Sequence, residues 1–404
     1  MKLHGPAEKV FLPEGFLFSF ATAGIKASGK PDLALAVAPG GAAAGAVFTL
    51  NRMAAAPVLV GRENLKKGRG SLRAVIVNSG NANCATGAPG LRAAGETCAA
   101  VGRALGIAPS EVLPSSTGII GVPLPVEKIL AAVPAAVAGL AAGEKALRAF
   151  GRAIMTTDLT PKLASASFKA GNKTVSVAGV AKGSGMIHPN MATMLVYIFC
   201  DVAGCAAELQ GRLKAAADVS FNSISVDGDT STNDTVLLLA SGTSGVKLSD
   251  AGAAEKFDKA LRAVCSSLAE QVVRDGEGAK HLVRLRITGA KTPEQARLAG
   301  RAIANSPLVK TAWAGCDPNW GRMFSALGTT GIPVDPAKVS IAIGPHSVFA
   351  RGGARPFDRK AAHRLLKRPE YVITIGLGLG RAAAEFLTCD LTHDYISINA
   401  EYST

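Results

Sequence analysis

Apolar and polar positions along the chain follow two periods, one typical of β-strands and the other of α-helices. Residues 33–37 alternate leucine or valine with alanine, residues 74–77 form a short apolar run, and residues 193–200 form a longer one rich in strand-forming side chains. Each of these segments predicts a buried strand, and the strand at residues 74–77 is expected to lead into a loop at Asn78. Apolar residues recur with helical spacing over residues 130–140, which predicts a helix with Pro134 near its first turn or at a kink.

The second half of the chain continues this mixture. Residues 283–287 alternate apolar side chains with arginine, which predicts a half-exposed strand. Thr292 is followed by proline and, three positions on, by glutamine, a pattern typical of a helix start. A strand over residues 371–375, a helix over residues 381–386 and a last strand from Tyr395 are predicted next. The fold class is therefore α/β (α+β), although periodicity does not give the strand order.

The composition indicates a folded chain with a core of small side chains. Its 404 residues are enough for two or three domains, and 48% hydrophobic against 18% charged residues excludes a disordered chain. Aromatic residues are only 5%, whereas there are 45 glycines. Sheets and helices are therefore expected to approach closely.

The net charge of +14 does not point to a nucleic acid or a membrane. The lysines and arginines are dispersed, and the densest cluster, at residues 66–69, is short and has no interleaved aromatic residues that could stack on bases. The uncharged stretches at residues 33–51 and 129–143 are broken by proline and glycine or are too short to span a membrane. No nucleic-acid or membrane partner is expected.

The cysteines and the N-terminus favour a cytoplasmic location. Seven cysteines without a Cys-x-x-Cys pair indicate reduced thiols rather than a disulfide or zinc framework. Residues 1–6 lack the apolar core of a signal peptide.

The segment at residues 182–195 (KGSGMIHPNMATML) is the strongest candidate for chemistry. It joins a lysine and a glycine-rich loop to Thr193, which opens the apolar run of residues 193–200. A hydroxyl held where a flexible loop enters a buried strand can act as a nucleophile. For an isolated threonine the simpler interpretation is its preference for strands.

Further motifs accompany this segment in a fixed order, and together they resemble the ornithine acetyltransferase family, the glutamate N-acetyltransferases of arginine biosynthesis. The resemblance covers almost the whole chain. Its motifs are residues 78–83 (NSGNAN), 115–121 (SSTGIIG), 156–158 (TTD), 182–195, 227–234 (DGDTSTND), 276–279 (GEGA), 317–322 (DPNWGR) and the chain end from Asn399 to Thr404.

The resemblance implies a four-layer α-β-β-α sandwich with two sheets between helical layers, and a smaller C-terminal lobe from about residue 285 to residue 404. It also implies that the protein cuts its own Ala192–Thr193 bond. Residues 1–192 would become an alpha chain, and residues 193–404 a beta chain that begins with the nucleophile and folds together with the alpha chain.

This cleavage has a chemical rationale. It frees an α-amino group on Thr193, and such an amine has a reference pKa of about 7.7–8.0, against about 10.4 for lysine. At neutral pH part of it is unprotonated and can serve as general base for the Thr193 hydroxyl.

The resemblance implies that the Thr117 hydroxyl and the Gly118 N–H stabilise the oxyanion. Losing one such donor typically raises the barrier by about 2.7–4 kcal/mol. Without the family, residues 115–118 would be interpreted as an ordinary polar turn.

The implied substrate-binding residues are Thr156, Lys182, Thr193, Glu277, Asn399 and Thr404. Lys182 suits a substrate carboxylate, and Glu277 between two glycines suits a cation. The alternatives are a helix N-cap for Thr156, a solvated loop for Glu277 and a frayed terminus for Thr404. Asn399 on a strand needs a polar partner, so the chain end is expected to fold back over the site.

The implied reaction is a double displacement through an acetyl-Thr193 ester. Thr193 takes acetyl from N2-acetyl-L-ornithine, ornithine leaves, and L-glutamate takes the acetyl group. No metal or organic cofactor is expected, and some members of the family also use acetyl-CoA as donor. The family further implies an (αβ)2 heterotetramer.

Two other classes compete with this interpretation. A self-processing aminopeptidase or amidase with an N-terminal nucleophile and a related fold would use water as acceptor. A basic binding protein without catalysis would not depend on Thr193. Lys182, Glu277 and the segment from Asn399 to Thr404 favour the transferase.

Two shorter motifs are weaker than they look. Residues 227–231 suggest a calcium loop, but Thr232 and Leu238 stand where such a loop needs Gly and Glu. Residues 376–380 follow a predicted strand and precede a predicted helix, but Arg381 replaces the last glycine of a dinucleotide fingerprint.

Overall fold

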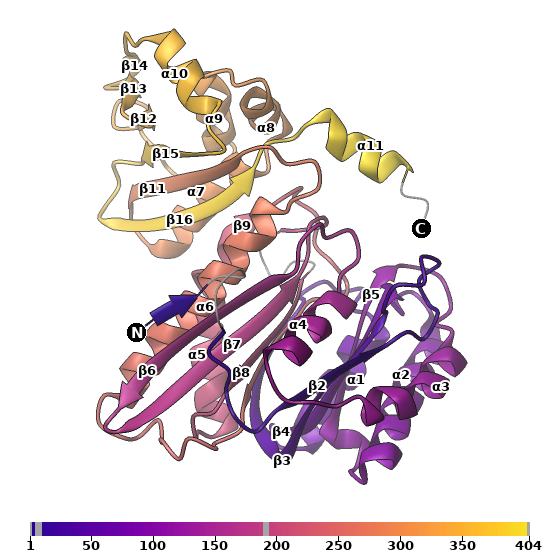
Figure 1. Ribbon diagram of the computed structural model, residues 1–404. Helices are drawn as coiled ribbons and strands as arrows, with labels where there is room; N and C mark the ends of the chain where they lie inside the picture. Colours follow the sequence, from indigo (N-terminus) through magenta and orange to yellow (C-terminus); the bar gives the residue numbers. More distant parts are fainter. Residues whose placement is uncertain (1, 5–9, 189–193, 402–404) are drawn as a thin grey trace.

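The computed structural model describes residues 2–4, 10–188 and 194–401 as two sheets with helices around them (Figure 1). The larger sheet has nine strands in the order β1-β6-β7-β8-β10-β3-β4-β5, with β2 paired to β3. Its strands are β1 (Lys2–His4), β2 (Leu17–Ala21), β3 (Leu33–Phe48), β4 (Ser71–Asn81), β5 (Val112–Ile119), β6 (Lys162–Ala170), β7 (Lys173–Lys182), β8 (Leu195–Cys200) and β10 (Thr235–Ala240).

The long strand β3 folds this sheet over on itself. Its first part pairs with β2 and β4, and its last part pairs with β10. The register with β4 shifts between Val37 and Ala42, where the chain carries Pro39 and two glycines, and Gly41 has a φ of 79°. Proline and a glycine at positive φ are the residues that interrupt and bend a strand. The β2-β3-β4-β5 part therefore forms one layer, and the part from β1 to β10 forms a second.

The two layers face each other across an aromatic cluster. The Phe199 ring on β8 lies edge-on to Phe16 and Phe18, at centroid distances of 5.1 and 4.8 Å, and Phe150 on α4 (Glu144–Ala153) lies 6.1 Å from Phe18. Neighbouring residues on the same strands point outward, because successive side chains of a strand alternate between faces. Val196 and Ile198, for example, belong to the separate cluster beneath α6 (Ala253–Arg274).

Helices cover both outer faces, so the expected four-layer α-β-β-α fold is confirmed. Side chains of α5 (Ala206–Asp218) and α6 (Ala253–Arg274) pack on the β6-β7-β8-β10 layer. Side chains of α2 (Gly87–Leu105) and α3 (Val126–Ala138) pack on the other layer, with α1 (Ala56–Lys67) beside β5. Gly45 shows why small residues matter, since a Cβ there would lie 2.9 Å from the Gln210 backbone of α5.

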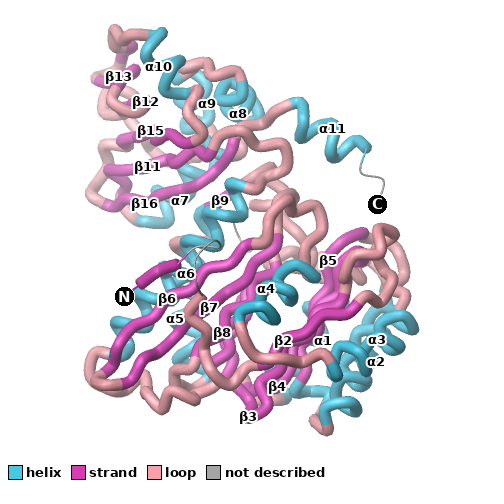
Figure 2. Tube along the Cα trace, in the orientation of Figure 1, coloured by secondary structure: helices cyan, strands magenta, loops and turns pink. Residues whose placement is uncertain are grey.

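The smaller sheet is formed by residues 224–225 and by strands from the C-terminal part of the chain, and Figure 2 labels its strands. Its order is β14-β13-β12-β15-β11-β16-β9, and four helices pack around it or close to it. The strands are β9 (Ile224–Ser225), β11 (Leu282–Ala290), β12 (Ser340–Ile343), β13 (His346–Ala350), β14 (Gly353–Ala354), β15 (Glu370–Gly376) and β16 (Ala382–Cys389); the helices are α7 (Pro293–Ala304), α8 (Pro307–Ala314), α9 (Trp320–Gly328) and α10 (Arg359–Leu366).

Most of the periodic segments have the structure that their pattern predicts. Residues 33–37, 74–77, 283–287 and 371–375 lie in β3, β4, β11 and β15, and the apolar run that ends at Cys200 is β8. Thr292 caps α7, its hydroxyl accepting the Gln295 N–H at 3.2 Å. Pro134 lies inside α3 on its exposed side.

Three local predictions are wrong. Residues 381–386 lie largely in strand β16, which pairs with β11, because strand pairing outweighs the helix preference of alanine. The chain from Tyr395 is part of helix α11 (His393–Glu401) and adds no strand to either sheet among the described residues. Asn78 continues β4 rather than opening a loop.

Among the residues described, no helix is both long and apolar enough to cross a membrane.

The aromatic cluster predicts a contrast between two phenylalanines of β2. Phe18 is 2% exposed and contacts Phe150 and Phe199, whereas Phe20 is 47% exposed. Phe18→Ala should lower the free energy of unfolding by about 3–5 kcal/mol and Phe20→Ala by less than about 1 kcal/mol. Urea unfolding of both variants beside the wild type measures this, and equal losses would mean that the cluster does not join the layers.

Candidate active site

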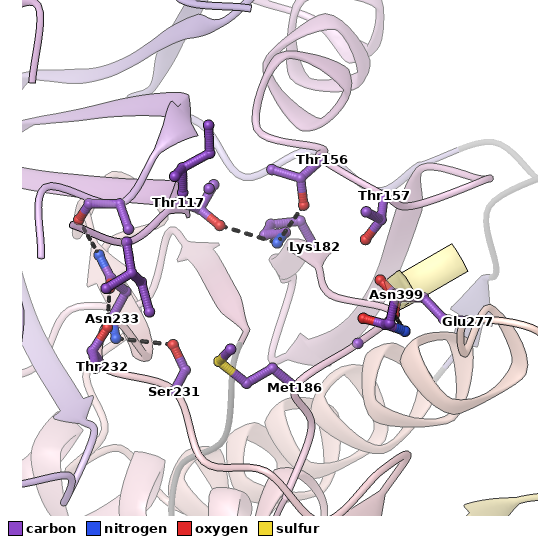
Figure 3. A pocket seen from close by; sticks show the side chains of 15 residues that line it. Thr117, Thr156, Thr157, Lys182, Met186, Ser231, Thr232, Asn233, Glu277 and Asn399 are labelled. Atoms are coloured by element: carbon purple, nitrogen blue, oxygen red, sulfur yellow. Dashed lines mark hydrogen bonds between the residues drawn. The ribbon is translucent and has the colours of Figure 1, made fainter. Parts of the chain in front are cut away.

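A cavity of about 320 Å³ lies where β5 and β7 end and where loops from both parts of the chain meet (Figure 3). Six of the predicted site residues line it: Thr117, Gly118, Thr156, Lys182, Glu277 and Asn399. The other lining residues are Ala82, Ile119, Ile120, Thr157, Gly185, Met186, Ser231, Thr232 and Asn233. Ala192, Thr193 and Thr404 lie outside the described residues.

Lys182 is the central cation of this cavity. It is the last residue of β7, is 4% exposed, and donates from Nζ to Thr156 Oγ1 at 2.9 Å and to Thr117 Oγ1 at 3.1 Å. Burial lowers the pKa of its ammonium group, and the nearby Lys162 acts in the same direction. The carboxylates of Asp158, Glu277 and Asp234 oppose that change.

Thr117 and Gly118 lie at the end of β5, so the polar-turn alternative is wrong. The Thr117 hydroxyl accepts a hydrogen bond from Lys182, which leaves its own proton able to point at another acceptor. Gly118 has a φ of 134°, and a Cβ at this position would lie 2.3 Å from the Gly80 carbonyl carbon. Only glycine fits here, so β4 and β5 can close tightly at the cavity wall.

Glu277 faces the cavity from the loop that follows α6. Its N–H donates to the Ser184 carbonyl at 2.9 Å, which ties this loop to the segment after β7. A Cβ on Gly185 would lie 2.3 Å from Glu277 Oε2, so the carboxylate occupies the space that this glycine leaves open. Asn399 Nδ2 donates to the same Oε2 at 2.9 Å.

Helix α11 therefore reaches the cavity from the C-terminal end of the described chain (Figures 1 and 3). The expectation that Asn399 lies on a strand is wrong, but it does have a polar partner at the cavity. Tyr395, one turn earlier on the helix, donates from its hydroxyl to Asp227 Oδ2 at 3.3 Å. A Cβ on Gly278 would lie 2.4 Å from Tyr395 N, so glycine is needed for this close approach.

Asp227 holds the loop that leads to the predicted cleavage site. Its carboxylate accepts the N–H groups of Met186 at 2.6 Å and Ile187 at 2.9 Å. Met186 has a φ of 55°, a conformation that non-glycine residues seldom adopt without support. Burial raises the pKa of Asp227 to about 6, although these N–H donors act in the opposite direction. The carboxylate that suggested a calcium loop is thus used to fix backbone.

Asp234 and Asn233 hold the opposite wall. Asp234 is buried and accepts the Met194 N–H at 2.9 Å, so it fixes the first described residue after the predicted nucleophile. Burial raises its pKa well above the ordinary value. Asn233 Nδ2 donates to the carbonyls of Ala82 at 2.6 Å and Ser116 at 2.9 Å, and so contacts both the residue after β4 and strand β5 of the other layer.

Three supporting carboxylates were not predicted as residues of this site: Asp158, Asp227 and Asp234. Each lies within a motif that carries the family resemblance, and that is the only signal by which they could have been found. Within residues 2–4, 10–188 and 194–401, no three His, Cys, Asp or Glu side chains lie close enough together to hold a metal ion.

The layered fold and a cavity with a buried ammonium group beside candidate oxyanion donors define an α/β enzyme. The chain matches the ArgJ family model over residues 17–404 and belongs to that family. This membership confirms the resemblance seen in the motifs and favours the transferase over the aminopeptidase alternative.

Two relatives that match almost the whole chain agree with this assignment. The arginine biosynthesis bifunctional protein ArgJ of Symbiobacterium thermophilum is 46% identical over 98% of both chains. The protein of the same name from Thermosynechococcus vestitus is 44% identical over 97% of both chains. A crystal structure of ornithine acetyltransferase complexed with ornithine, from Mycobacterium tuberculosis, matches at 42% identity with a TM-score of 0.43, covering 46% of this chain and 97% of that one.

The raised pKa of Asp227 predicts a pH-dependent stability. The folded protein keeps this proton up to about pH 6, whereas an unfolded chain loses it near pH 4. The stability linked to the proton is complete below about pH 4 and is lost as the pH rises through about 6. In Asp227→Asn this loss is absent, so the free energy of unfolding of the variant relative to wild type should rise by about 1.4 kcal/mol per pH unit in that window.

Urea unfolding of both proteins at several pH values between 4 and 7 measures this difference. Asp201, whose pKa burial also raises to about 6, is present in both proteins and cancels. A difference that does not change with pH would show that Asp227 is ionised throughout.

Proposed function

We propose that this chain is a self-cleaving acetyltransferase of arginine biosynthesis that moves the acetyl group of N2-acetyl-L-ornithine to L-glutamate. The observation that carries the proposal is the convergence of Lys182, Thr117, Thr156, Glu277 and Asn399 on one cavity, in a chain that matches the ArgJ family over residues 17–404. These residue types suit an amino-acid substrate with a carboxylate, an ammonium group and an acyl group.

Thr193 is the proposed nucleophile, first for cleavage of the chain and then for acetyl transfer. Its hydroxyl oxygen attacks the Ala192 carbonyl carbon, the carbon–nitrogen bond breaks, and the nitrogen gains the proton that the hydroxyl loses. Water then hydrolyses the ester between the two chains. The products are an alpha chain of residues 1–192 and a beta chain of residues 193–404 with a free α-amino group on Thr193.

The anchoring of the next residue supports this role. Met194 is buried, its N–H donates to Asp234, and its carbonyl accepts the Thr235 N–H at 3.2 Å. The strand that begins one residue later pairs with β7 and β10, and Leu195 lies opposite Lys182. A segment anchored in this way directly after Thr193 suits a nucleophile, because catalysis by positioning requires a fixed attachment.

Acetyl transfer then proceeds in two half-reactions. The α-amine of Thr193 takes the hydroxyl proton as the oxygen attacks the acetyl carbon of acetylornithine. The Thr117 hydroxyl and the Gly118 N–H stabilise the oxyanion, ornithine leaves with the proton, and acetyl-Thr193 remains. The amino group of glutamate attacks this ester and regenerates the threonine.

The two charged side chains of the cavity divide the recognition of the substrate. Lys182 binds the α-carboxylate that both substrates carry, and Glu277 binds the side-chain ammonium of ornithine. Thr156, Asn399 and Thr404 complete the set of substrate-binding residues. The reaction uses no metal or organic cofactor, and acetyl-CoA is a candidate second acetyl donor.

The wider assembly is proposed on the family resemblance alone. Two alpha and two beta chains form an (αβ)2 heterotetramer in the cytoplasm. The smaller lobe extends from about residue 285 to the end of the beta chain.

Replacing the nucleophile tests the proposal directly. Thr193→Ala should remain one uncut chain without transferase activity, whereas Thr193→Ser, which keeps a hydroxyl, should still be cut. Intact-mass spectrometry, with an assay of acetyl transfer from acetylornithine to glutamate, measures both. Two fragments from Thr193→Ala would place the nucleophile elsewhere, and an uncut wild type without activity would remove the proposed function.

Glu277→Gln tests the recognition of the ornithine ammonium. The amide keeps an acceptor for Asn399 but loses the charge, so KM for acetylornithine should rise by about tenfold or more, with self-cleavage unchanged. Steady-state kinetics measures KM, and Glu63→Gln at an exposed position of α1 is the control. Equal losses of cleavage and transfer would point to a folding defect instead.

A further inference from the structure

Asp158 touches the active site at two backbone points without lining the cavity. Its Oδ1 accepts the Gly183 N–H at 2.6 Å, and its Oδ2 accepts the Thr156 N–H at 3.0 Å. The first N–H group belongs to the residue after Lys182, and the second belongs to Thr156. The side chains of Lys182 and Thr156 are themselves joined by the 2.9 Å hydrogen bond from Nζ to Oγ1. One carboxylate therefore fixes the backbone of Thr156 and of the residue next to Lys182, on two separate segments of the chain.

The same carboxylate belongs to a buried ion triad. Lys162 Nζ lies 2.6 Å from Asp158 Oδ1 and 2.6 Å from Asp275 Oδ2, and the Lys162 side chain is 1% exposed. Asp275 accepts the Leu159 N–H at 3.0 Å and lies two residues before Glu277. The triad thus joins the chain segment that carries Thr156 to the one that carries Glu277, and both residues line the cavity.

Stability alone is a weak explanation for such a triad. Removing charges from water is unfavourable, and buried ion pairs can often be replaced by well-packed apolar side chains without loss of stability. Here, instead, the Asp158 carboxylate of the triad accepts hydrogen bonds from backbone N–H groups at the cavity. Its geometry defines the positions of groups that bind substrate.

We infer that Asp158 is a positioning residue of the active site, which orients Thr156 and Lys182 and sustains the positive charge that Lys182 presents to a substrate carboxylate. The inference rests on the proposed function, because that function assigns the carboxylate to Lys182. The role differs from that of Lys182 itself, since Asp158 acts through its neighbours.

The charges around Lys182 show why Asp158 matters for its protonation. Lys162 lowers the pKa of Lys182, whereas Glu277 and Asp234 raise it. Lys26 is a further cation near Lys182, and each repels the positive charge of the other. Burial raises the pKa of Asp234 well above its ordinary value, and in the proposed reaction Glu277 serves the substrate ammonium. Burial would also raise the pKa of Asp158, but Lys182 and Lys162 lower it to about 2. Asp158 is therefore the permanent counter-charge of Lys182.

The test compares Asp158→Asn with Asp275→Asn in the full-length protein. Both variants remove one negative charge from Lys162. Only the first disturbs the contacts with Gly183 and Thr156, because asparagine keeps one acceptor oxygen where the two N–H groups use one each. In Asp158→Asn, KM for acetylornithine should rise by about tenfold or more. The alkaline limb of kcat/KM should also move about one pH unit lower, because Lys182 loses its counter-charge and a tenfold change in its protonation equilibrium equals one pH unit. Asp275→Asn should be less stable but keep the wild-type alkaline limb.

A merely structural Asp158 would give a different result. The amount of active enzyme would fall, while KM and the alkaline limb stayed at their wild-type values, and this outcome would overturn the inference. Asp201→Asn is a second control, because Asp201 is also a buried acceptor of a backbone N–H but lies away from the cavity. It should leave KM unchanged.

If Asp158→Asn does not fold, Asp158→Glu takes its place. It keeps the charge and lengthens the side chain by one methylene group, so KM should rise while the alkaline limb stays in place; an unchanged KM would overturn the inference. Failure of the proposed function is distinguishable, because the wild type itself would then lack acetyl transfer.

Discussion

The buried ammonium group of Lys182 is the constraint on which the rest of the site depends. An ammonium taken out of water is strongly unfavourable unless hydrogen-bond acceptors and opposite charge surround it. Thr117 and Thr156 supply acceptors, and Asp158 supplies the charge. Thr117 belongs to β5, and Thr156 and Asp158 belong to the loop after α4. The lysine can be buried only if the two layers of the large sheet are in register at this point.

The folded-over sheet provides that register. Because β3 pairs with β4 in one layer and with β10 in the other, the position of β5 is linked to that of β8 and β7 through continuous hydrogen-bonded strands. Edge-on phenylalanine rings then fix the spacing between the layers. Small residues such as Gly118 remove the side chains that would otherwise separate the strands at the cavity. The alanine- and glycine-rich composition thus has a direct structural use.

Sequence patterns identified the helices and strands in which buried side chains recur at a regular spacing. They failed where the local structure depends on residues far away in the sequence. β3, β4, β11 and β15 carry their own periodicity, whereas β16 depends on β11, a hundred residues earlier, for its pairing. The family motifs gave six residues that line the cavity. They did not reveal that Asp158, Asp227 and Asp234 act on backbone N–H groups 25 to 41 residues away. A carboxylate that binds distant backbone leaves no local pattern in a single sequence.

Helix α11 shows how one such carboxylate joins the ends of the site. Tyr395 and Asn399 are four residues apart, so a helix places them on one face, and they reach Asp227 and Glu277 respectively. A strand would set these side chains about twice as far apart along its axis. Asp227 also holds Met186 in its left-handed conformation, at the start of the loop that leads to the proposed cleavage site. The last described helix and that loop therefore share one acceptor, and a movement of either one changes the hydrogen bonding of the other.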